Sequence, residues 1–296
     1  MSSPPPIVLS QGALRCEVSP ALGGCIAGLW CADVPVLRST PAAQLQSVRL
    51  SGSYPLVPYS NRQAFAQMHW AGADYPLTPN FAPEPHAIHG VGWERVWAVI
   101  GGDAQSVTLH YQHAPDASWP FAFDCTQHIL LESDAQYGEA LVLTMRITNN
   151  GTEPFPAGLG WHPYFAKHSG ARIAFAAHNR WEMDADKLPT QRLPNAGLKT
   201  DCASLSVDHC FDGWSGEVHL QDDLLDTRIS SDLTQLVVFT TPARDNIAIE
   251  PVSHTNNALN LLARGVASAD DLGVRVLQPH QSLGVRMRIA VRRMPT

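Results

Sequence analysis

The sequence has no long apolar run, no block of basic residues before its last strand-like segment and no Cys-x-x-Cys pair. No window approaches the roughly 18 apolar residues that a membrane-spanning helix needs. The net charge is −7, which disfavours nucleic acid and anionic membranes as partners. The amino terminus has no basic region before its short apolar run, so a secretory signal is not expected there.

The cysteines are scattered along the chain, in a pattern that fits neither a small disulfide scaffold nor a zinc ribbon. There are six: Cys16, Cys25, Cys31, Cys125, Cys202 and Cys210. Reduced thiols are typical of the cytosol, so the sequence predicts a cytoplasmic protein with free cysteines.

Several motifs that indicate a particular kind of catalysis are missing. The chain has no Gly-x-Ser-x-Gly elbow, no Gly-x-Gly-x-x-Gly or Walker loop and no His-Glu-x-x-His. His86 and His89 lie three residues apart and His162 could join them, but no fourth ligand stands at a recognisable spacing. We therefore expect no metal and no cofactor, which leaves acid–base chemistry.

What is present is a repeated alternation of apolar and polar residues, typical of half-buried antiparallel strands. It is clearest at residues 14–18, 107–111, 141–147 and 285–291. In the last of these, Arg286, Arg288 and Arg292 should face solvent. With 296 residues, 23 prolines and 21 glycines, the chain is expected to form one all-β sandwich domain over residues 1–296, with residues 1–6 as a flexible tail.

Residues 51–90 interrupt this pattern with six prolines, which exclude a regular helix and most central strands. Loops of that length are more often functional than idle. Helical periodicity is weak everywhere, and the best candidate for a short helix is residues 256–263.

Two stretches each fix a titratable residue directly before a proline. His162 precedes Pro163 within the aromatic stretch 158–165, and Glu250 precedes Pro251 at the end of an apolar run. Proline holds the residue before it in extended backbone, and a carboxylate in a buried-looking run must be paired or catalytic. The pair offers one acid and one base.

Two polar clusters lie in the proline-rich region. One contains Asn61 and Arg62; the other contains His86 and His89, followed by Gly90 and Gly92. The glycines would allow backbone or a ligand to approach closely.

Together these stretches resemble the ordered motifs of the aldose 1-epimerase (galactose mutarotase) family. The resemblance rests on Tyr59-Ser-Asn-Arg62, His86-Ala-Ile-His-Gly90, Gly158-Leu-Gly-Trp-His-Pro-Tyr-Phe165, Val207-Asp-His-Cys-Phe211 and Ile249-Glu-Pro-Val252 with Ala258-Leu-Asn260. It implies the family's large antiparallel supersandwich, with few short helices, and an isomerase that interconverts the α and β anomers of a free aldose.

The resemblance also implies a role for each matching residue. Glu250 corresponds to the general base that takes the proton from the anomeric hydroxyl, and His162 to the general acid that protonates the ring oxygen. Arg62 and His89 correspond to groups that hold and polarise the sugar, with Asn61 beside them. Asp208 corresponds to a carboxylate that grips sugar hydroxyls, and Asp212 is the alternative for that role.

The substrate and some competing functions stay open at this stage. We expect an unphosphorylated aldose, because a phosphorylated hexose would need further arginine or lysine near the pocket; Arg95 is one conceivable contributor. The competing functions are a non-catalytic carbohydrate-binding protein and a glycosidase that pairs Glu250 with Asp208 or Asp212. A monomer or a homodimer is expected.

Overall fold

The structure is a computed structural model that describes residues 5–295. Antiparallel strands dominate it, and the described chain contains two short α-helices, α1 (Ala258–Ala263) and α2 (Ala269–Leu272). The predicted all-β sandwich with few short helices is confirmed, and α1 lies where the short helix was expected. The predicted tail, residues 1–6, falls mostly outside the described residues.

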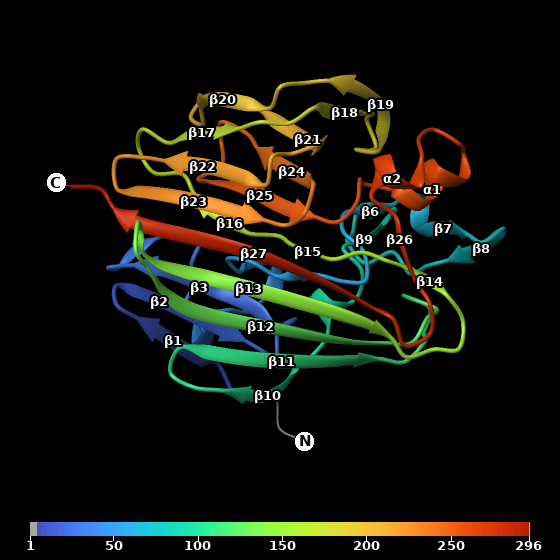
Figure 1. The fold of residues 1–296 in the computed structure, drawn as a ribbon, viewed down its shortest axis with the longest axis horizontal. Coiled ribbons are helices and arrows are strands. Elements are labelled where there is room, and N and C mark those ends of the chain that lie inside the picture. The colour runs from blue at the N-terminus through green and yellow to red at the C-terminus, as the bar shows by residue number, and fades with distance from the viewer. Residues whose placement is uncertain (1–4, 296) are drawn as a thin grey trace.

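The largest sheet has nine strands and joins the two halves of the chain. Its strands in spatial order are β10 (Ala98–Gly102), β11 (Ser106–His113), β12 (Phe123–Asp134), β13 (Gly138–Asn149), β27 (Ser282–Arg293), β23 (Leu225–Ser231), β22 (Glu217–Gln221), β17 (Arg172–Phe175) and β20 (Leu198–Asp201). The last strand of the chain, β27, therefore lies inside the sheet and links its two halves, pairing with β13 on one side and β23 on the other (Figure 1).

An eight-stranded sheet carries Asp208 and Glu250, and His162 lies between two of its strands. It runs β19 (Pro189–Pro194), β18 (Asn179–Met183), β21 (Val207–Asp212), β24 (Gln235–Thr240), β25 (Asn246–Val252), β15 (Gly160–Trp161) and β5 (Pro55–Leu56), and β16 (Tyr164–Ala166) also pairs with β25.

Smaller sheets and single helical turns complete the fold. They are β1 (Ile7–Gln11), β2 (Leu14–Ser19), β3 (Cys25–Cys31) and β4 (Val34–Pro35); β14 (Phe155–Ala157) with β26 (Arg275–Leu277); β6 (Arg62–Gln63) with β9 (Ala87–Ile88); β7 (Gln67–Trp70) with β8 (Ala73–Pro76); and 3₁₀ turns at Ala42–Gln44, Val48–Leu50, Ala64–Ala66 and Gly92–Glu94.

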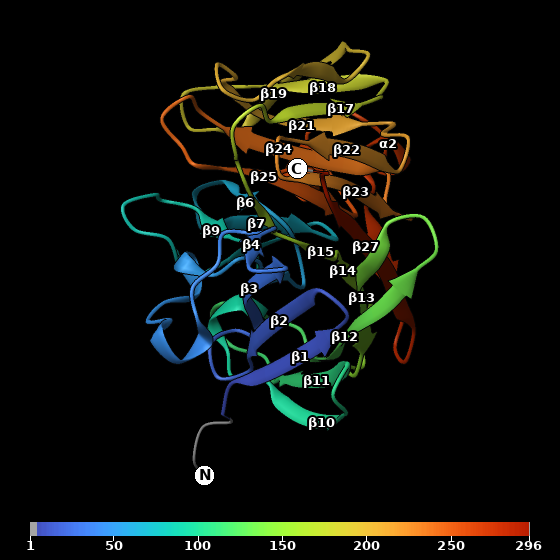
Figure 2. The same ribbon diagram turned by 90° about the vertical axis from the view of Figure 1, so that its left-hand side faces the viewer.

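The two large sheets share one hydrophobic core. The rings of Phe175 on β17 and Phe211 on β21 lie 5.0 Å apart, and the indole N–H of Trp161 on β15 donates to the side-chain oxygen of Gln127 on β12 at 2.8 Å. In Figure 2, β17–β25 gather at the top and β1, β2, β10 and β11 at the bottom, with β6 and β9 at the level between them. That intermediate level is where the polar motifs meet.

Burial explains the two kinds of strand pattern. On β12 the apolar positions from Phe123 to Leu131 alternate with partly exposed ones, as expected for a sheet with one face in the core. All seven residues of β25 are buried, so its apolar run reflects cover on both faces. A carboxylate at position 250 of this strand is therefore a buried carboxylate.

The arginine stripe of β27 faces solvent at Arg286 and Arg292, as predicted, and Arg288 is partly exposed. Arg288 also pairs with Glu132 and Asp134, and Arg292 with Asp226. Arg288 and Arg292 therefore also form cross-strand charge pairs, in addition to the solvent-facing position that the alternation predicted. The proline-rich region is irregular as expected, with strands β5–β9 of two to four residues each.

Candidate active site

His162 and Glu250 meet because their strands pair on both sides of them. The register joins Gly160 to Val252 and Tyr164 to Ala248, which puts His162 opposite Glu250. The imidazole Nε2 lies 3.1 Å from Glu250 Oε1. The two residues are 6% and 2% exposed, so an acid–base pair from distant parts of the chain lies in a nearly dry setting.

Each member of this pair keeps one polar atom without a protein partner. Among the described residues, His162 Nδ1 and Glu250 Oε2 are buried and make no hydrogen bond. Buried polar atoms are normally satisfied, because leaving them unpaired is costly. An unpaired carboxylate oxygen facing a cavity is an acceptor for a ligand hydroxyl.

Burial controls the protonation of the pair. Burial and then the charge of Asp208 raise the pKa of Glu250 well above its ordinary value. Burial, followed by the charges of His89 and Arg38, lowers the pKa of His162 well below its ordinary value. Both shifts favour the neutral forms of the two side chains. Nε2 and Oε1, 3.1 Å apart, lie within hydrogen-bond distance, and either residue can carry the proton between them.

The pocket that contains this pair has a volume of about 160 Å³. This is below the roughly 300 to 1,000 Å³ of pockets for drug-sized ligands, as expected for a single sugar ring. Its wall includes all six residues that the sequence assigned to the site: Asn61, Arg62, His89, His162, Asp208 and Glu250.

The opposite wall comes from the loop that leads into β6 and the turn that follows β9. Asn61 and His89 both adopt left-handed backbone, with φ of 56° and 62°. The backbone N–H of Asn61 donates to His89 Nδ1 at 3.1 Å, so the proton of the neutral ring resides on Nε2. Burial, then the charge of Arg62, lowers the pKa of His89 to about 3. His89 is therefore a neutral hydrogen-bond donor.

Arg62 is held by a network that the motifs did not reveal. Its guanidinium donates two hydrogen bonds to Glu84, at 2.7 and 2.9 Å, and a further one to the amide oxygen of Asn61. Lys187 also donates to Glu84 at 2.9 Å. Burial alone would raise the pKa of Glu84, but the hydrogen bonds from Arg62 and Lys187 outweigh it and lower that pKa to about 2. Asn61 thus serves first to fix Arg62.

The two aspartates of β21 have different surroundings. Asp208 lines the pocket, and its carboxylate makes no hydrogen bond or ion pair within residues 5–295. Burial raises the pKa of Asp208. Asp212 instead accepts hydrogen bonds from Asn179 and Arg192 away from the pocket. Of the two alternatives, only Asp208 faces the cavity.

His86 and Gly90 of the motifs have structural roles. His86 Nδ1 accepts from the backbone N–H of Phe65 at 2.9 Å, and its Nε2 lies 3.1 Å from the carbonyl oxygen of Asp186. Gly90 has a φ of 70°, and a Cβ there would lie 2.2 Å from the carbonyl oxygen of Val57. The close approach foreseen at this glycine is thus made by backbone.

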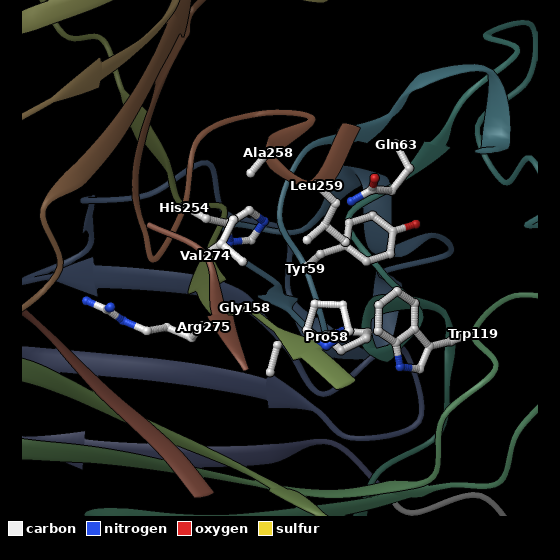
Figure 3. Close-up of a pocket in the computed structure, with 12 residues that line it drawn as sticks. Pro58, Tyr59, Gln63, Trp119, Gly158, His254, Ala258, Leu259, Val274 and Arg275 are labelled. Carbon is white, nitrogen blue, oxygen red and sulfur yellow. The ribbon is translucent and has the colours of Figure 1, made fainter. Parts of the chain in front are cut away.

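A second cavity, of about 10 Å³, is lined partly by residues 58–63, the segment that also carries Asn61 and Arg62 of the pocket (Figure 3). It is lined by Pro58, Tyr59, Gly158, His254 and residues of α1, and His254 Nε2 accepts from the backbone N–H of Ser60 at 3.2 Å. Burial lowers the pKa of His254 to about 4. This neutral histidine anchors the segment that carries Asn61 and Arg62.

Aromatic rings surround His162 rather than forming one flat wall. Tyr164 stacks on the imidazole with ring centroids 4.3 Å apart, and Tyr54 lies 4.9 Å away. Both tyrosines line the pocket with Phe81 and Phe239. Trp161, although adjacent in sequence, is in the core.

The sequence did not identify Glu84, Lys187, Tyr54 or Arg244, which also line the pocket. Glu84 lies in the proline-rich region already marked as functional, so that region was the only available signal. Arg95 is not a lining residue; it pairs with Asp116 at 3.2 Å.

Three further observations concern cysteines, metals and membranes. All six cysteines are buried and free, as predicted. Across residues 5–295, no group of three or more His, Cys, Asp or Glu side chains is placed to hold a metal ion. No helix in the same part of the chain is long and apolar enough to span a membrane.

Comparisons with known proteins identify similar chains. A family model described as aldose 1-epimerase matches residues 6–288. The uncharacterized protein YphB of Escherichia coli K12 is 29% identical over 90% of this chain and 97% of its own.

Solved structures give the same result for the fold. A candidate aldose 1-epimerase from Escherichia coli K12 superposes with a TM-score of 0.85 at 25% identity, covering 98% of this chain and 99% of its own. A galactose mutarotase-like protein from Clostridium acetobutylicum gives a TM-score of 0.81 at 18% identity, covering 98% and 95%.

Proposed function

Because the chain belongs to the aldose 1-epimerase family, we propose that it is a mutarotase that interconverts the anomers of a free aldose. The observation that carries the proposal is that Glu250 and His162 lie side by side on the wall of a pocket of monosaccharide size, 3.1 Å apart at their nearest atoms. Ring opening needs one proton taken from O1 and one delivered to the ring oxygen. One base and one acid suffice.

In this proposal Glu250 acts as the base. Its Oε2 atom has no partner within the described chain and accepts the proton of the anomeric hydroxyl. Burial raises the pKa of this carboxylate toward the working pH, and a general base is most effective when its pKa lies near that pH. His162 delivers the shared proton to the ring oxygen through Nε2. Rotation about the C1–C2 bond and reversal of both transfers give the other anomer.

The other lining residues hold the sugar. Neutral His89 donates a hydrogen bond through its Nε2–H. Arg62 presents a fixed positive charge because Glu84 and Asn61 restrain its guanidinium. The His89 hydrogen bond and the Arg62 charge both stabilise the negative charge that develops on sugar oxygens during ring opening. Asp208 accepts hydrogen bonds from hydroxyls, since its carboxylate has no protein partner in the described residues.

Polarimetry of freshly dissolved α-D-galactose, α-D-glucose and several pentoses tests the proposal. We expect at least one sugar to reach anomeric equilibrium faster in proportion to protein concentration. A sugar that binds without faster equilibration would indicate the carbohydrate-binding protein instead. Release of reducing sugar from a glycoside would indicate the glycosidase.

A further inference from the structure

The imidazole of His162 lacks the hydrogen bond that usually orients a functional histidine. In most such sites one ring nitrogen is bonded to a carboxylate or a carbonyl oxygen, and that bond fixes the plane of the ring. Here Nδ1 is buried without a partner among the described residues. Nε2 nevertheless lies 3.1 Å from Glu250 Oε1, so the orientation of the ring has to come from packing.

Tyr164 provides the closest packing against this imidazole. The centroids of the two rings lie 4.3 Å apart, and the rings are inclined by 29°. Tyr54 and His89 lie farther away, at 4.9 and 5.1 Å, and His89 meets the ring edge-on. Tyr164 is only partly buried and lines the pocket, so its own ring needs support from the protein.

That support is the guanidinium of Arg38, which lies 3.9 Å from the centroid of the Tyr164 ring. The guanidinium is itself fixed. Its Nε and Nη2 donate to the carbonyl oxygen of Ser51 at 3.0 and 2.6 Å, and Nη2 also donates to that of Arg49 at 2.7 Å. These side-chain hydrogen bonds all go to carbonyl oxygens, and Arg38 is not a lining residue of the pocket. Its charge therefore reaches the site only from behind Tyr164.

The backbone keeps the arginine and the tyrosine in register. The backbone N–H of Arg38 donates to the carbonyl oxygen of Tyr164 at 2.7 Å, and an antiparallel bridge one residue earlier joins Leu37 to Phe165. Strand β16 also pairs with β25, the strand of Glu250. Arg38, Tyr164 and Glu250 thus come from three neighbouring backbone segments whose alignment is fixed by hydrogen bonds.

We propose that Arg38 is a positioning residue for the mutarotase reaction, which holds His162 in line with Glu250 through the ring of Tyr164. The inference rests on the proposed function. A small rotation of the imidazole would move Nε2 away from both the carboxylate and the sugar's ring oxygen. Misplacement of a reacting group by about 1 Å costs about 10²-fold in rate, so a stack that fixes the ring acts directly on kcat.

The charge of Arg38 has a second effect on the same histidine. Burial is the main cause of the low pKa of His162, and the charges of His89 and then Arg38 add to it. An imidazolium near a further cation is a stronger acid, so it gives its proton to the ring oxygen more readily. The titratable and charged groups around the ring are Glu250 on β25, His89 after β9, Tyr54 before β5, Tyr164 on β16 with Arg38 behind it, and Arg244 in the turn between β24 and β25.

Arg38→Met tests the proposal in the whole protein, because it keeps a long side chain against Tyr164 but removes the charge and the planar stack. We expect kcat for anomer exchange to fall about tenfold, with KM changed less than about twofold because Arg38 does not touch the sugar. Arg15→Met is the matched control. Arg15 also stacks its guanidinium on an aromatic ring, that of Trp30, at 3.9 Å and lies outside the pocket, so this variant should behave as the wild type.

A double-mutant cycle tests the route through the tyrosine. Tyr164→Leu removes the ring and should lower kcat by itself. Adding Arg38→Met should then change kcat by less than about twofold, because the link between the arginine and the histidine is already gone. A tenfold loss from Arg38→Met that persisted in the Tyr164→Leu protein would overturn the proposal.

The pH profile of kcat separates the charge of Arg38 from its shape. A second proton on the pair of His162 and Glu250 stops catalysis at low pH, and the positive charge of Arg38 opposes that proton. Arg38→Met should therefore move the acid limb upward by about 0.5 to 1 pH unit. Arg38→Lys keeps the charge without the planar stack, so it should leave the limb in place and lower kcat about threefold.

Two results would contradict the proposal even if Arg38→Met failed to fold. One is wild-type kcat in Arg38→Lys. The other comes from NMR without any sugar: the nuclear Overhauser contacts between the rings of His162 and Tyr164 should weaken in Arg38→Lys, and unchanged contacts would show that the stack does not depend on the guanidinium. Failure of every sugar to exchange faster than in buffer would instead remove the proposed function, and the catalytic role of Arg38 with it, whatever the NMR contacts show.

Discussion

The active-site pocket and the His254 cavity are built partly from the same segment, residues 58–63, and each contains a buried histidine. In the cavity both nitrogens of His254 are bonded, to the N–H of Ser60 and to the hydroxyl of Ser253. In the pocket His162 Nδ1 has no partner among the described residues, and Nε2 faces Glu250. Burial alone therefore does not separate a catalytic histidine from a structural one.

The aspartates of β21 repeat this contrast. Asp208 and Asp212 lie four residues apart on one strand. Asp212 is bonded to Asn179 and Arg192, whereas Asp208 faces the cavity without a protein partner in residues 5–295. A polar group that the fold leaves unpaired, at a cavity large enough for a ligand, is a group kept for that ligand. The following variants test this rule.

Glu250→Gln should have the largest effect. The amide cannot accept the O1 proton, and a positioned proton transfer contributes about 10² to 10⁴ in rate. We expect kcat for anomer exchange to fall about 10³-fold or more, with sugar binding and the circular dichroism spectrum unchanged. Turnover near the wild-type level would remove Glu250 from the mechanism.

His162→Asn and His254→Asn should separate catalysis from folding. We expect His162→Asn to lower kcat about 10²-fold or more, with a loss of stability smaller than the loss in His254→Asn, because its Nδ1 has no partner in the described chain. We expect His254→Asn to lower the free energy of unfolding by about 2 kcal/mol, because the Ser60 N–H loses its acceptor. Urea denaturation and the exchange assay measure both, and the reverse pattern would contradict the assignment.

Asp208→Asn and Asp212→Asn give a smaller, parallel contrast. Asp208→Asn should lower kcat/KM about tenfold through weaker hydroxyl binding. Asp212→Asn should destabilise the fold by about 2 kcal/mol, less than a fully buried pair because Arg192 is 33% exposed. If Asp212→Asn reduced activity without loss of stability, the roles of the two aspartates would have to be exchanged.

The pH dependence of stability tests the structural role of His254 in the unmodified protein. The pKa of His254 is about 4 in the fold and about 6.5 when unfolded, so the unfolded chain binds the proton first as pH falls. The contribution is complete above pH 6.5 and is lost toward pH 4. About 2.5 pH units at about 1.4 kcal/mol each give roughly 3 kcal/mol. Urea denaturation at pH 7.5 and 5 should show a smaller difference in His254→Asn than in the wild type.

The sequence predicted the strand architecture because alternation reports directly which face of a strand is buried. The lining residues that lie in motifs were predicted through the resemblance of those motifs to the aldose 1-epimerase family; Pro163 and Pro251 by themselves mark only His162 and Glu250 as positions held extended. The pairing of β15 and β16 with β25, which brings His162 to Glu250, is a long-range register that no local pattern encodes.

Residues outside the motifs could not be found in this way. Glu84 and Lys187 acquire their role only from the contacts around Arg62, and Arg38 only from its contact with Tyr164.

The central claim is that Glu250 and His162 open and close a sugar ring by moving two protons. Two-dimensional NMR exchange between the α and β forms of a reducing sugar, alongside its methyl glycoside, tests this directly. The account predicts exchange that grows with protein concentration for the free sugar and none for the glycoside, whose O1 carries no proton. Anomerisation of the glycoside, or no acceleration for any reducing sugar, neutral or anionic, would contradict it.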